Sequence, residues 1–334
     1  MKATSGRAEP PMPARSTRRQ DDPDPEPRTR ERSPTGAQWE IAHGAQRAVV
    51  TEVGATLRSY TFGEHPVLAG FGEGEWSDGG RGQVLAPWPN RLGDGHYRFG
   101  DLSVQAPLDE PERNNAIHGL VRWLPWRLEV KAQNLVAARC HLFPTPGYPF
   151  NLELRVEYRL GRDGLTVSTL ATNVGRLTLP FGIGFHPYFR PAAEPIDIAL
   201  LELPAYERLV LDERGLPTGE VRGVEGTEYD FTEQRAIGPT RLDTAYTGLE
   251  RGRDRLAWAE LTDPAEKLST RLWMDEGFGY LMCYTGDTLE ERDRRRAVAL
   301  EPMTCPPDAL RSGRGLIILE RGQRWEGAWG IVPR

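Results

Sequence analysis

The alternation of apolar and polar side chains with a period of two constrains the fold of this chain most. It is clearest in residues 151–160, NLELRVEYRL, where every second side chain from Leu152 to Leu160 is apolar or aromatic. The turn sequence GRDG follows, and LTVSTLATN then resumes the same period. Such a pattern predicts two half-buried strands joined as a hairpin. The segments WRLEV and LIILERGQRWEGAWGIV show the pattern again.

Helical periodicity over more than two turns is nearly absent, so we expect an all-β, antiparallel fold with few short helices. Residues 37–334 contain no linker, and an apolar fraction of 38% is enough for a core. We therefore expect one β-sandwich domain over 37–334. Residues 1–36 carry seven prolines, eight Lys/Arg and six Asp/Glu, with no Val, Ile, Leu, Phe, Trp or Tyr. This composition predicts a disordered N-terminal tail.

Composition also excludes several classes of function. A formal charge of −6 argues against nucleic acid as a partner, because phosphate binding needs a basic surface. The three cysteines have no CxxC spacing and supply no disulfide framework. The sequence shows neither an apolar run of the roughly 18 residues that a membrane span needs nor a signal peptide. We expect a cytoplasmic protein with no membrane contact.

Local motifs for metals and phosphates are missing from the sequence. The six histidines form no HxH, HExxH or HxxxH pattern, which leaves only a metal site assembled from distant residues, and we expect none. There is no GxSxG or Walker sequence. The glycine-rich stretch 70–83, GFGEGEWSDGGRGQ, contains acidic residues that would repel phosphate. We expect it to be a flexible surface loop.

Two early stretches place polar residues in strongly structured surroundings. In APWPNRLGDGHYRFG, Asn90 and Arg91 stand where an apolar strand gives way to a loop. The planar guanidinium of Arg91 suits vicinal oxygens, but it suits a salt bridge at a turn equally well. In NNAIHGLVRWLPW, His118 is either a satisfied core residue or a functional one. Trp126 offers a flat face for a sugar ring and fits a core equally well.

Two later stretches carry candidate acid–base groups. In GFHPYFR, His186 precedes a proline that favours extended backbone, and Tyr188 follows. In ALEPMTCPPDAL, Glu301 comes after an apolar strand, at a point where site residues often occupy the following loop. Glu301, like Asp243 in RLDTAY, is either exposed or functional. A histidine and a carboxylate are the minimum for paired acid–base catalysis, but spacing does not show whether these two face each other.

Taken in order, these stretches resemble the aldose 1-epimerase (mutarotase) family. The resemblance runs from about Trp39 to the C-terminus and rests on PNRLGDGHYRF, HGLVRW, GFHPYF, LDTAYTGL, CYTGD and LEPMTCPPDA. HGLVRW resembles a bacterial subgroup, since many mutarotases continue the histidine motif as Gly-Gly-x-x-Gly-Phe-Asp. Met282 stands where the family often has glutamine. These two departures leave the preferred sugar open.

The resemblance implies a β-supersandwich that needs no metal or organic cofactor. It makes Glu301 the general base and His186 the general acid, with the carboxylate raising the pKa of the imidazole. Arg91, His118 and Asp243 are expected to bind sugar hydroxyls. The expected substrate-binding set is completed by Asn90, Trp126 and Tyr188.

The function that the resemblance implies is interconversion of the α and β anomers of a free, glucose- or galactose-like aldohexose. The expected partner is this monosaccharide, bound by a monomer or homodimer. Three alternatives stay open: a hexose-6-phosphate 1-epimerase, a non-catalytic sugar-binding or sensory module on the same fold, and a glycosidase that uses Asp243 and Glu301 as its carboxylate pair.

Overall fold

The computed structural model describes residues 33–192 and 195–334, which are built almost entirely from antiparallel strands. Most of the predicted tail, residues 1–32, lies outside the described residues. The described end of the predicted tail, residues 33–36, contacts the domain, because Ser33 Oγ donates a hydrogen bond to the Glu73 carbonyl at 2.6 Å and Thr35 is buried. No helix in the described ranges is long and apolar enough to cross a bilayer.

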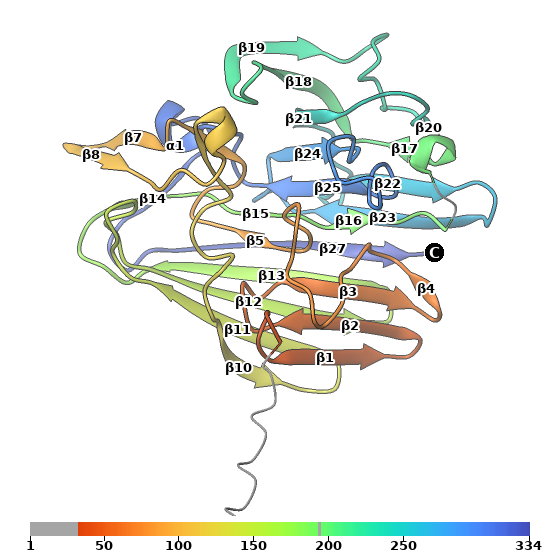
Figure 1. Ribbon diagram of the computed structural model, residues 1–334, viewed down its shortest axis with the longest axis horizontal. Coiled ribbons are helices and arrows are strands. Elements are labelled where there is room, and N and C mark those ends of the chain that lie inside the picture. Colours follow the sequence, from red (N-terminus) through yellow and green to blue (C-terminus); the bar gives the residue numbers. More distant parts are fainter. Residues whose placement is uncertain (1–32, 193–194) are drawn as a thin grey trace, which may run out of the picture. The chain divides into compact units, whose positions relative to one another are not determined.

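The largest sheet has nine strands and contains the hairpin that the alternation predicted (Figure 1). Its strands, in spatial order, are β10 (Arg127–Lys131), β11 (Leu135–Leu142), β12 (Leu152–Gly161), β13 (Gly164–Asn173), β27 (Arg324–Pro333), β23 (Leu268–Met274), β22 (Ala257–Asp263), β17 (Leu200–Glu202) and β20 (Arg235–Ala236). In the hairpin, Leu160 pairs with Leu165, and Gly161 pairs with Gly164. The apolar positions of β12 are buried, as a period of two requires.

A second sheet of eight strands carries the residues of the candidate site. Its order is β19 (Pro217–Gly223), β18 (Ala205–Leu211), β21 (Asp243–Leu249), β24 (Tyr280–Tyr284), β25 (Val298–Met303), β15 (Gly184–Phe185) and β5 (Val84–Leu85), with β16 (Tyr188–Phe189) also paired to β25. This sheet packs on the nine-stranded sheet through Phe185 of β15 and Trp329 of β27, whose ring centroids are 5.1 Å apart. The layered, all-β expectation is confirmed.

Smaller sheets and short helices complete the domain. Four strands form a sheet that packs on β11 and β12: β1 (Gln38–His43), β2 (Gln46–Thr51), β3 (Leu57–Phe62) and β4 (His65–Pro66). Three pairs stand apart: β6 (Arg91–Gly93) with β9 (Asn115–Ile117), β7 (His96–Phe99) with β8 (Leu102–Gln105), and β14 (Leu179–Phe181) with β26 (Ile317–Leu319). The helices of the described residues are α1 (Ala309–Ser312) and the 3-10 turns η1 (Pro111–Arg113) and η2 (Ile196–Ile198).

Strands β24 and β25 have one face toward the core and one toward the candidate site. Leu281, Cys283 and Leu300 belong to the main core cluster. Met282 and Glu301 point to the opposite face, because successive side chains of a strand alternate. The same alternation that builds the sandwich therefore lines a second, partly polar surface with buried residues.

Candidate active site

The register of three strands brings His186 opposite Glu301. Strands β15 and β16 both pair with β25, with Gly184 opposite Met303 and Tyr188 opposite Ala299. His186 lies midway between the two strands, so it falls opposite Glu301. The two side chains share a face, and Nε2 of His186 is 3.3 Å from Oε1 of Glu301. Glu301 lies within β25 and is buried, so its expected place on a following loop is wrong.

The pair lies at the bottom of a cleft of about 580 Å³. Asn90, Arg91 and His118 line one side of this cleft. Other parts of its wall come from Asp243, Tyr284 and Leu289. The volume is in the range that holds a small polar ligand. The structure thus collects seven of the eight predicted site residues in one cavity: Asn90, Arg91, His118, His186, Tyr188, Asp243 and Glu301.

His118 is both a hydrogen-bonded buried residue and a cleft residue. Its backbone N–H donates to the Asn90 carbonyl at 2.9 Å, continuing the β6–β9 ladder. The Asn90 N–H donates to Nδ1 of His118 at 3.2 Å, so the neutral ring carries its proton on Nε2. Burial, with the nearby His186, Arg122 and Arg91, holds the pKa of His118 well below its usual value. A neutral imidazole with a fixed N–H donor results.

Arg91 likewise combines the two roles that its sequence allowed, because it forms a salt bridge and also faces the cleft. Its Nε donates to the two carboxylate oxygens of Glu110 at 3.1 and 2.9 Å, and Nη2 donates to Oε1 at 3.0 Å. Its Nη1 lies 3.7 Å from Oδ2 of Asp243, on the open side of the cleft. Glu110 therefore fixes one edge of the guanidinium, and the remaining N–H groups are available to a ligand beside Asp243.

Burial dominates the electrostatics of the His186–Glu301 pair. It raises the pKa of Glu301 well above its usual value, with a further rise from Asp243 and a smaller opposing effect from Arg91. Burial also lowers the pKa of His186 to about 3, and the guanidiniums of Arg122, Arg81 and Arg91 add to this direction. The expectation that Glu301 raises the imidazole pKa is wrong, because burial favours the neutral form of both groups and a protonated Glu301 has no charge that would stabilise the imidazolium.

The segment Gly79–Gln83 covers the imidazole, although the glycine-rich stretch was expected to be a flexible loop. Residues 72–76 are exposed, but Gly80–Gln83 are buried. Gly80 has a φ of +76°, and a Cβ at this position would lie 2.6 Å from Cδ2 of His186. Only glycine allows this close approach. Tyr188 stacks on the His186 ring with the centroids 4.9 Å apart, and its hydroxyl donates to the Gly79 carbonyl at 2.7 Å.

Trp126 does not belong to the cleft. Its side chain is 2% exposed within the main core cluster, and its Nε1 donates to the Val121 carbonyl at 3.2 Å. The predicted sugar contact of Trp126 is therefore corrected to a core role, the other reading that its sequence allowed. Tyr188 lines the cleft, but its hydroxyl already donates to the Gly79 carbonyl. Its role in the cleft is the stacking of its ring on His186.

Several cleft residues were not predicted from the sequence. Glu110, Asp109 and Arg122 form two ion pairs in the wall, Arg91–Glu110 and Arg122–Asp109. Glu110 occurs in a polar stretch, PLDEPERNN, that has no periodicity or motif. No sequence signal relates it to Arg91. Within residues 33–192 and 195–334, no three His, Cys, Asp or Glu side chains are grouped as metal ligands.

Comparison with known proteins gives one family model, described as aldose 1-epimerase, that matches residues 37–331. Among curated relatives, the uncharacterized protein YihR of Escherichia coli K12 is 34% identical over 291 residues, which cover 86% of this chain and 91% of YihR. A maltose epimerase of Levilactobacillus brevis is 25% identical over 312 residues, covering 84% and 89% of the two chains.

Solved structures confirm the fold. The GalM/aldose epimerase homologue from C. elegans superposes with a TM-score of 0.80 at 18% identity, covering 89% of this chain and 98% of the homologue. At this identity the likeness concerns architecture alone. The same layered sheets thus occur in a protein whose sequence has diverged widely.

Proposed function

Because this chain belongs to the aldose 1-epimerase family and is an isomerase, we propose that it interconverts the α and β anomers of a free aldohexose of the glucose or galactose type. The observation that carries the proposal is the contact between His186 and Glu301, 3.3 Å apart at the bottom of the cleft. A buried acid–base pair has no use in simple sugar binding, whereas anomer exchange needs one group on each of two sugar oxygens.

In the proposed reaction, Glu301 accepts the proton of the C1 hydroxyl while His186 donates a proton to the ring oxygen. The bond between C1 and the ring oxygen breaks, and an open-chain aldehyde forms. Rotation about C1–C2 presents the other face of the carbonyl. On closure the ring oxygen attacks C1, its proton returns to His186, and Glu301 returns a proton to the C1 oxygen. Each group acts once as acid and once as base.

The pKa directions of Glu301 and His186 fit a pair that holds one proton between its two members. The neutral form, with Glu301 protonated and His186 neutral, is favoured by burial and is also the form reached when the sugar is open. Oε2 of Glu301 has no hydrogen-bond partner among the described residues. The C1 hydroxyl of a bound sugar can donate to it, which favours the carboxylate and moves the proton to His186.

Three wall residues are proposed to hold the sugar. The Nε2–H of His118 is a fixed donor, because its Nδ1 accepts from Asn90. Arg91 and Asp243 present a donor and an acceptor side by side, 3.7 Å apart, which suits two adjacent hydroxyls. Asp243 is the more open of the two, with 44% of its side chain exposed.

The charges of the cleft support an unphosphorylated substrate. Arg91 is bound by Glu110, Arg122 forms an ion pair with Asp109, and Arg113 lies 3.8 Å from Glu110. A phosphate would have to compete with these carboxylates for every arginine of the cleft wall. Neutral hydroxyls can use the remaining donors and acceptors without breaking an ion pair.

Polarimetry of freshly dissolved α-glucose and α-galactose tests the proposal. We expect the wild type to accelerate the change in rotation of at least one of these sugars, and Glu301→Gln to lower this acceleration by at least about a hundredfold. Maltose belongs in the panel because one relative is named a maltose epimerase, and glucose 6-phosphate serves as the phosphorylated comparison. A wild type that accelerates only glucose 6-phosphate would overturn the assignment of a free sugar.

A further inference from the structure

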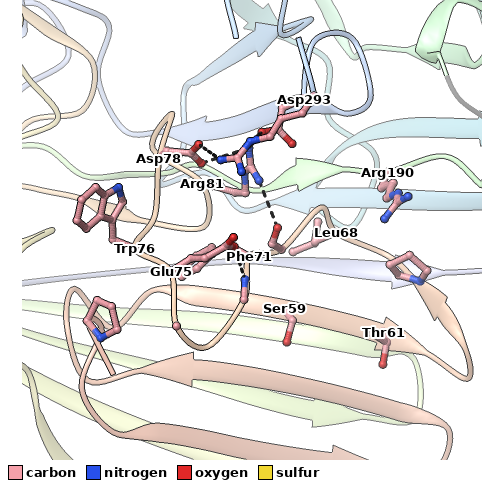
Figure 2. A pocket seen from close by; sticks show the side chains of 16 residues that line it. Ser59, Thr61, Leu68, Phe71, Glu75, Trp76, Asp78, Arg81, Arg190 and Asp293 are labelled. Atoms are coloured by element: carbon pink, nitrogen blue, oxygen red, sulfur yellow. Dashed lines mark hydrogen bonds and ion pairs between the residues drawn. The ribbon is translucent and has the colours of Figure 1, made fainter. Parts of the chain in front are cut away.

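A second hollow, of about 760 Å³, is lined in part by Phe71, Asp78 and Asp293 (Figure 2). Its wall includes Arg81, which precedes Gly82 in the segment that covers His186. The side chain of Arg81 is 10% exposed, so this guanidinium is held nearly out of water. Holding a long side chain in one rotamer costs entropy, which the contacts around it must offset.

Arg81 is anchored by three residues that belong to two loops. Its Nη2 lies 3.3 Å from Oδ1 of Asp78 and 3.4 Å from Oδ2 of Asp293. Its Nη1 donates to the Gly70 carbonyl at 3.3 Å. Figure 2 shows these contacts converging on the guanidinium. Arg81 therefore connects the loop before β5 with the loop between β24 and β25, which carries Asp293.

The same side chain contacts the support of the catalytic imidazole. The guanidinium carbon of Arg81 is 5.7 Å from the centroid of the Tyr188 ring, within reach of a cation–π contact. Tyr188 stacks on His186 with an angle of 10° between the ring planes. The backbone continues this support, since Gly82 N–H donates to the His186 carbonyl at 2.9 Å.

From these contacts we propose that Arg81 is a positioning residue for the epimerase reaction. By joining Asp78 to Asp293 it holds the Gly79–Gly80 turn and the Tyr188 ring against His186. This fixes the direction in which the imidazole faces Glu301 and the sugar. The inference rests on the proposed function, because it assigns Arg81 a task in the proton transfer of His186.

The expected consequence is a loss in turnover with little change in sugar binding. Arg81 does not line the catalytic cleft, so its replacement leaves the contacts of Arg91, His118 and Asp243 in place. A proton donor that is free to turn loses part of the advantage of fixed geometry, which can reach about a hundredfold for a displacement of 1 Å. We expect kcat to fall about tenfold or more, and KM to change less than about threefold.

Two substitutions separate geometry from charge. Arg81→Lys keeps the positive charge but loses the planar fork that reaches both carboxylates. Arg81→Gln also removes the charge, whose presence lowers the pKa of His186. We therefore expect kcat to fall in both variants. Only Arg81→Gln should shift the alkaline limb of the pH profile, which we assign to His186, to higher pH. The charged or titratable groups around His186 that stay constant in this comparison are Glu301, His118, Arg91, Arg122 and Tyr188.

The matched control is Arg292→Gln. Arg292 lies 3.6 Å from Asp78 and 3.2 Å from Asp293, but its side chain is 65% exposed and the described contacts do not join it to Tyr188. We expect wild-type kcat from this variant. Asp293→Asn offers a second route, because it weakens one anchor while Arg81 and its charge remain. If an Arg81 variant fails to fold, Asp293→Asn still tests the inference, because it should show part of the expected loss in kcat.

NMR of the ring nitrogens in the unliganded protein adds a readout that does not depend on turnover, with the His186 signal assigned by its loss in His186→Gln. We expect one ring environment in the wild type and Arg292→Gln, and a broadened or displaced signal in Arg81→Gln. Wild-type kcat and an unchanged His186 signal in folded Arg81 variants would overturn the inference. A wild type that accelerates no sugar would overturn the proposed function instead, and the ring signal would still decide the role of Arg81.

Discussion

Glu110 holds one edge of the Arg91 guanidinium through three short contacts, although the two residues lie on different elements of the domain. Arg91 begins β6, and Glu110 immediately precedes η1. Asn115 Nδ2 also donates to Glu110 Oε2 at 2.8 Å, so the carboxylate is itself held. The direction in which Arg91 meets a ligand is thus set by a residue that carries no recognisable motif.

Glu110→Gln should therefore weaken sugar binding. The amide cannot accept both N–H groups of Arg91 with the strength of a carboxylate, so the guanidinium is expected to turn. We expect KM to rise about tenfold, with kcat changing less, because Arg91 does not exchange protons with the sugar. Glu112→Gln is the control and should match the wild type, because the exposed Glu112 also lines the cleft but is not an ion-pair partner of Arg91. Equal KM values for both variants would show that Glu110 does not position Arg91.

Glu301→Gln should lower kcat by at least about a hundredfold, because an amide can neither accept nor return the C1 proton. The fold should persist, since glutamine matches the volume of the buried carboxylic acid. Polarimetry gives the rate and circular dichroism the fold. Full activity in a folded Glu301→Gln protein would exclude Glu301 as the base.

His186→Gln should remove one limb of the pH profile. The pair is active when it holds one proton, so activity should fall at high pH, where this proton is lost, and at low pH, where a second is gained. We expect a bell-shaped profile of kcat for the wild type and no alkaline limb for His186→Gln. An unchanged alkaline limb in this variant would assign the limb to another group.

The same pair should make stability depend on pH. Above about pH 6.5 the unfolded chain has Glu301 ionised and His186 neutral, whereas the folded pair keeps one proton because burial raises the pKa of Glu301. The unfolded state then binds fewer protons, so this pair should lower the free energy of unfolding by about 1.4 kcal/mol per pH unit as pH rises.

Between about pH 4.3 and 6.5 the unfolded pair also holds one proton, on His186, and this contribution should be flat. Glu301→Gln should lose the alkaline decline. It should instead lose stability below about pH 6.5, because burial lowers the pKa of His186 to about 3 in the folded state. Urea unfolding at several pH values measures both slopes. Parallel curves for the two proteins would contradict the raised pKa of Glu301.

Much of the fold follows from local pattern, whereas the site depends on register. The alternation in residues 151–173 determines a hairpin because every second side chain must be buried together. His186 contacts Glu301 because β15 and β16 both pair with β25, and no local sequence pattern predicts this pairing. Family resemblance indicated which residues matter, and the strand pairing supplied their distance.

Other features escaped the sequence because they depend on packing. The stretch 70–83 has the composition of an exposed loop, yet its second half is buried against His186 through the close approach of Gly80. The pKa of His186 was expected to rise beside a carboxylate, but burial of both groups reverses the direction. Neither the composition of a stretch nor the types of two residues predicts how deeply they are buried. Burial, and with it the direction of a pKa shift, depends on how the sheets pack.

Trp126 gives a prediction that separates stability from binding. Its indole is 2% exposed and donates to the Val121 carbonyl, so Trp126→Phe removes a hydrogen bond and leaves unfilled volume in the core. We expect the free energy of unfolding to fall by about 1–3 kcal/mol. KM should stay at the wild-type value, because the indole lies outside the cleft. Trp123→Phe, at a tryptophan that is 50% exposed, is the control and should change stability by less than about 0.5 kcal/mol. Urea unfolding and polarimetry at a temperature where both variants are folded measure the two effects. A raised KM in Trp126→Phe without a loss of stability would return this residue to the sugar-binding set.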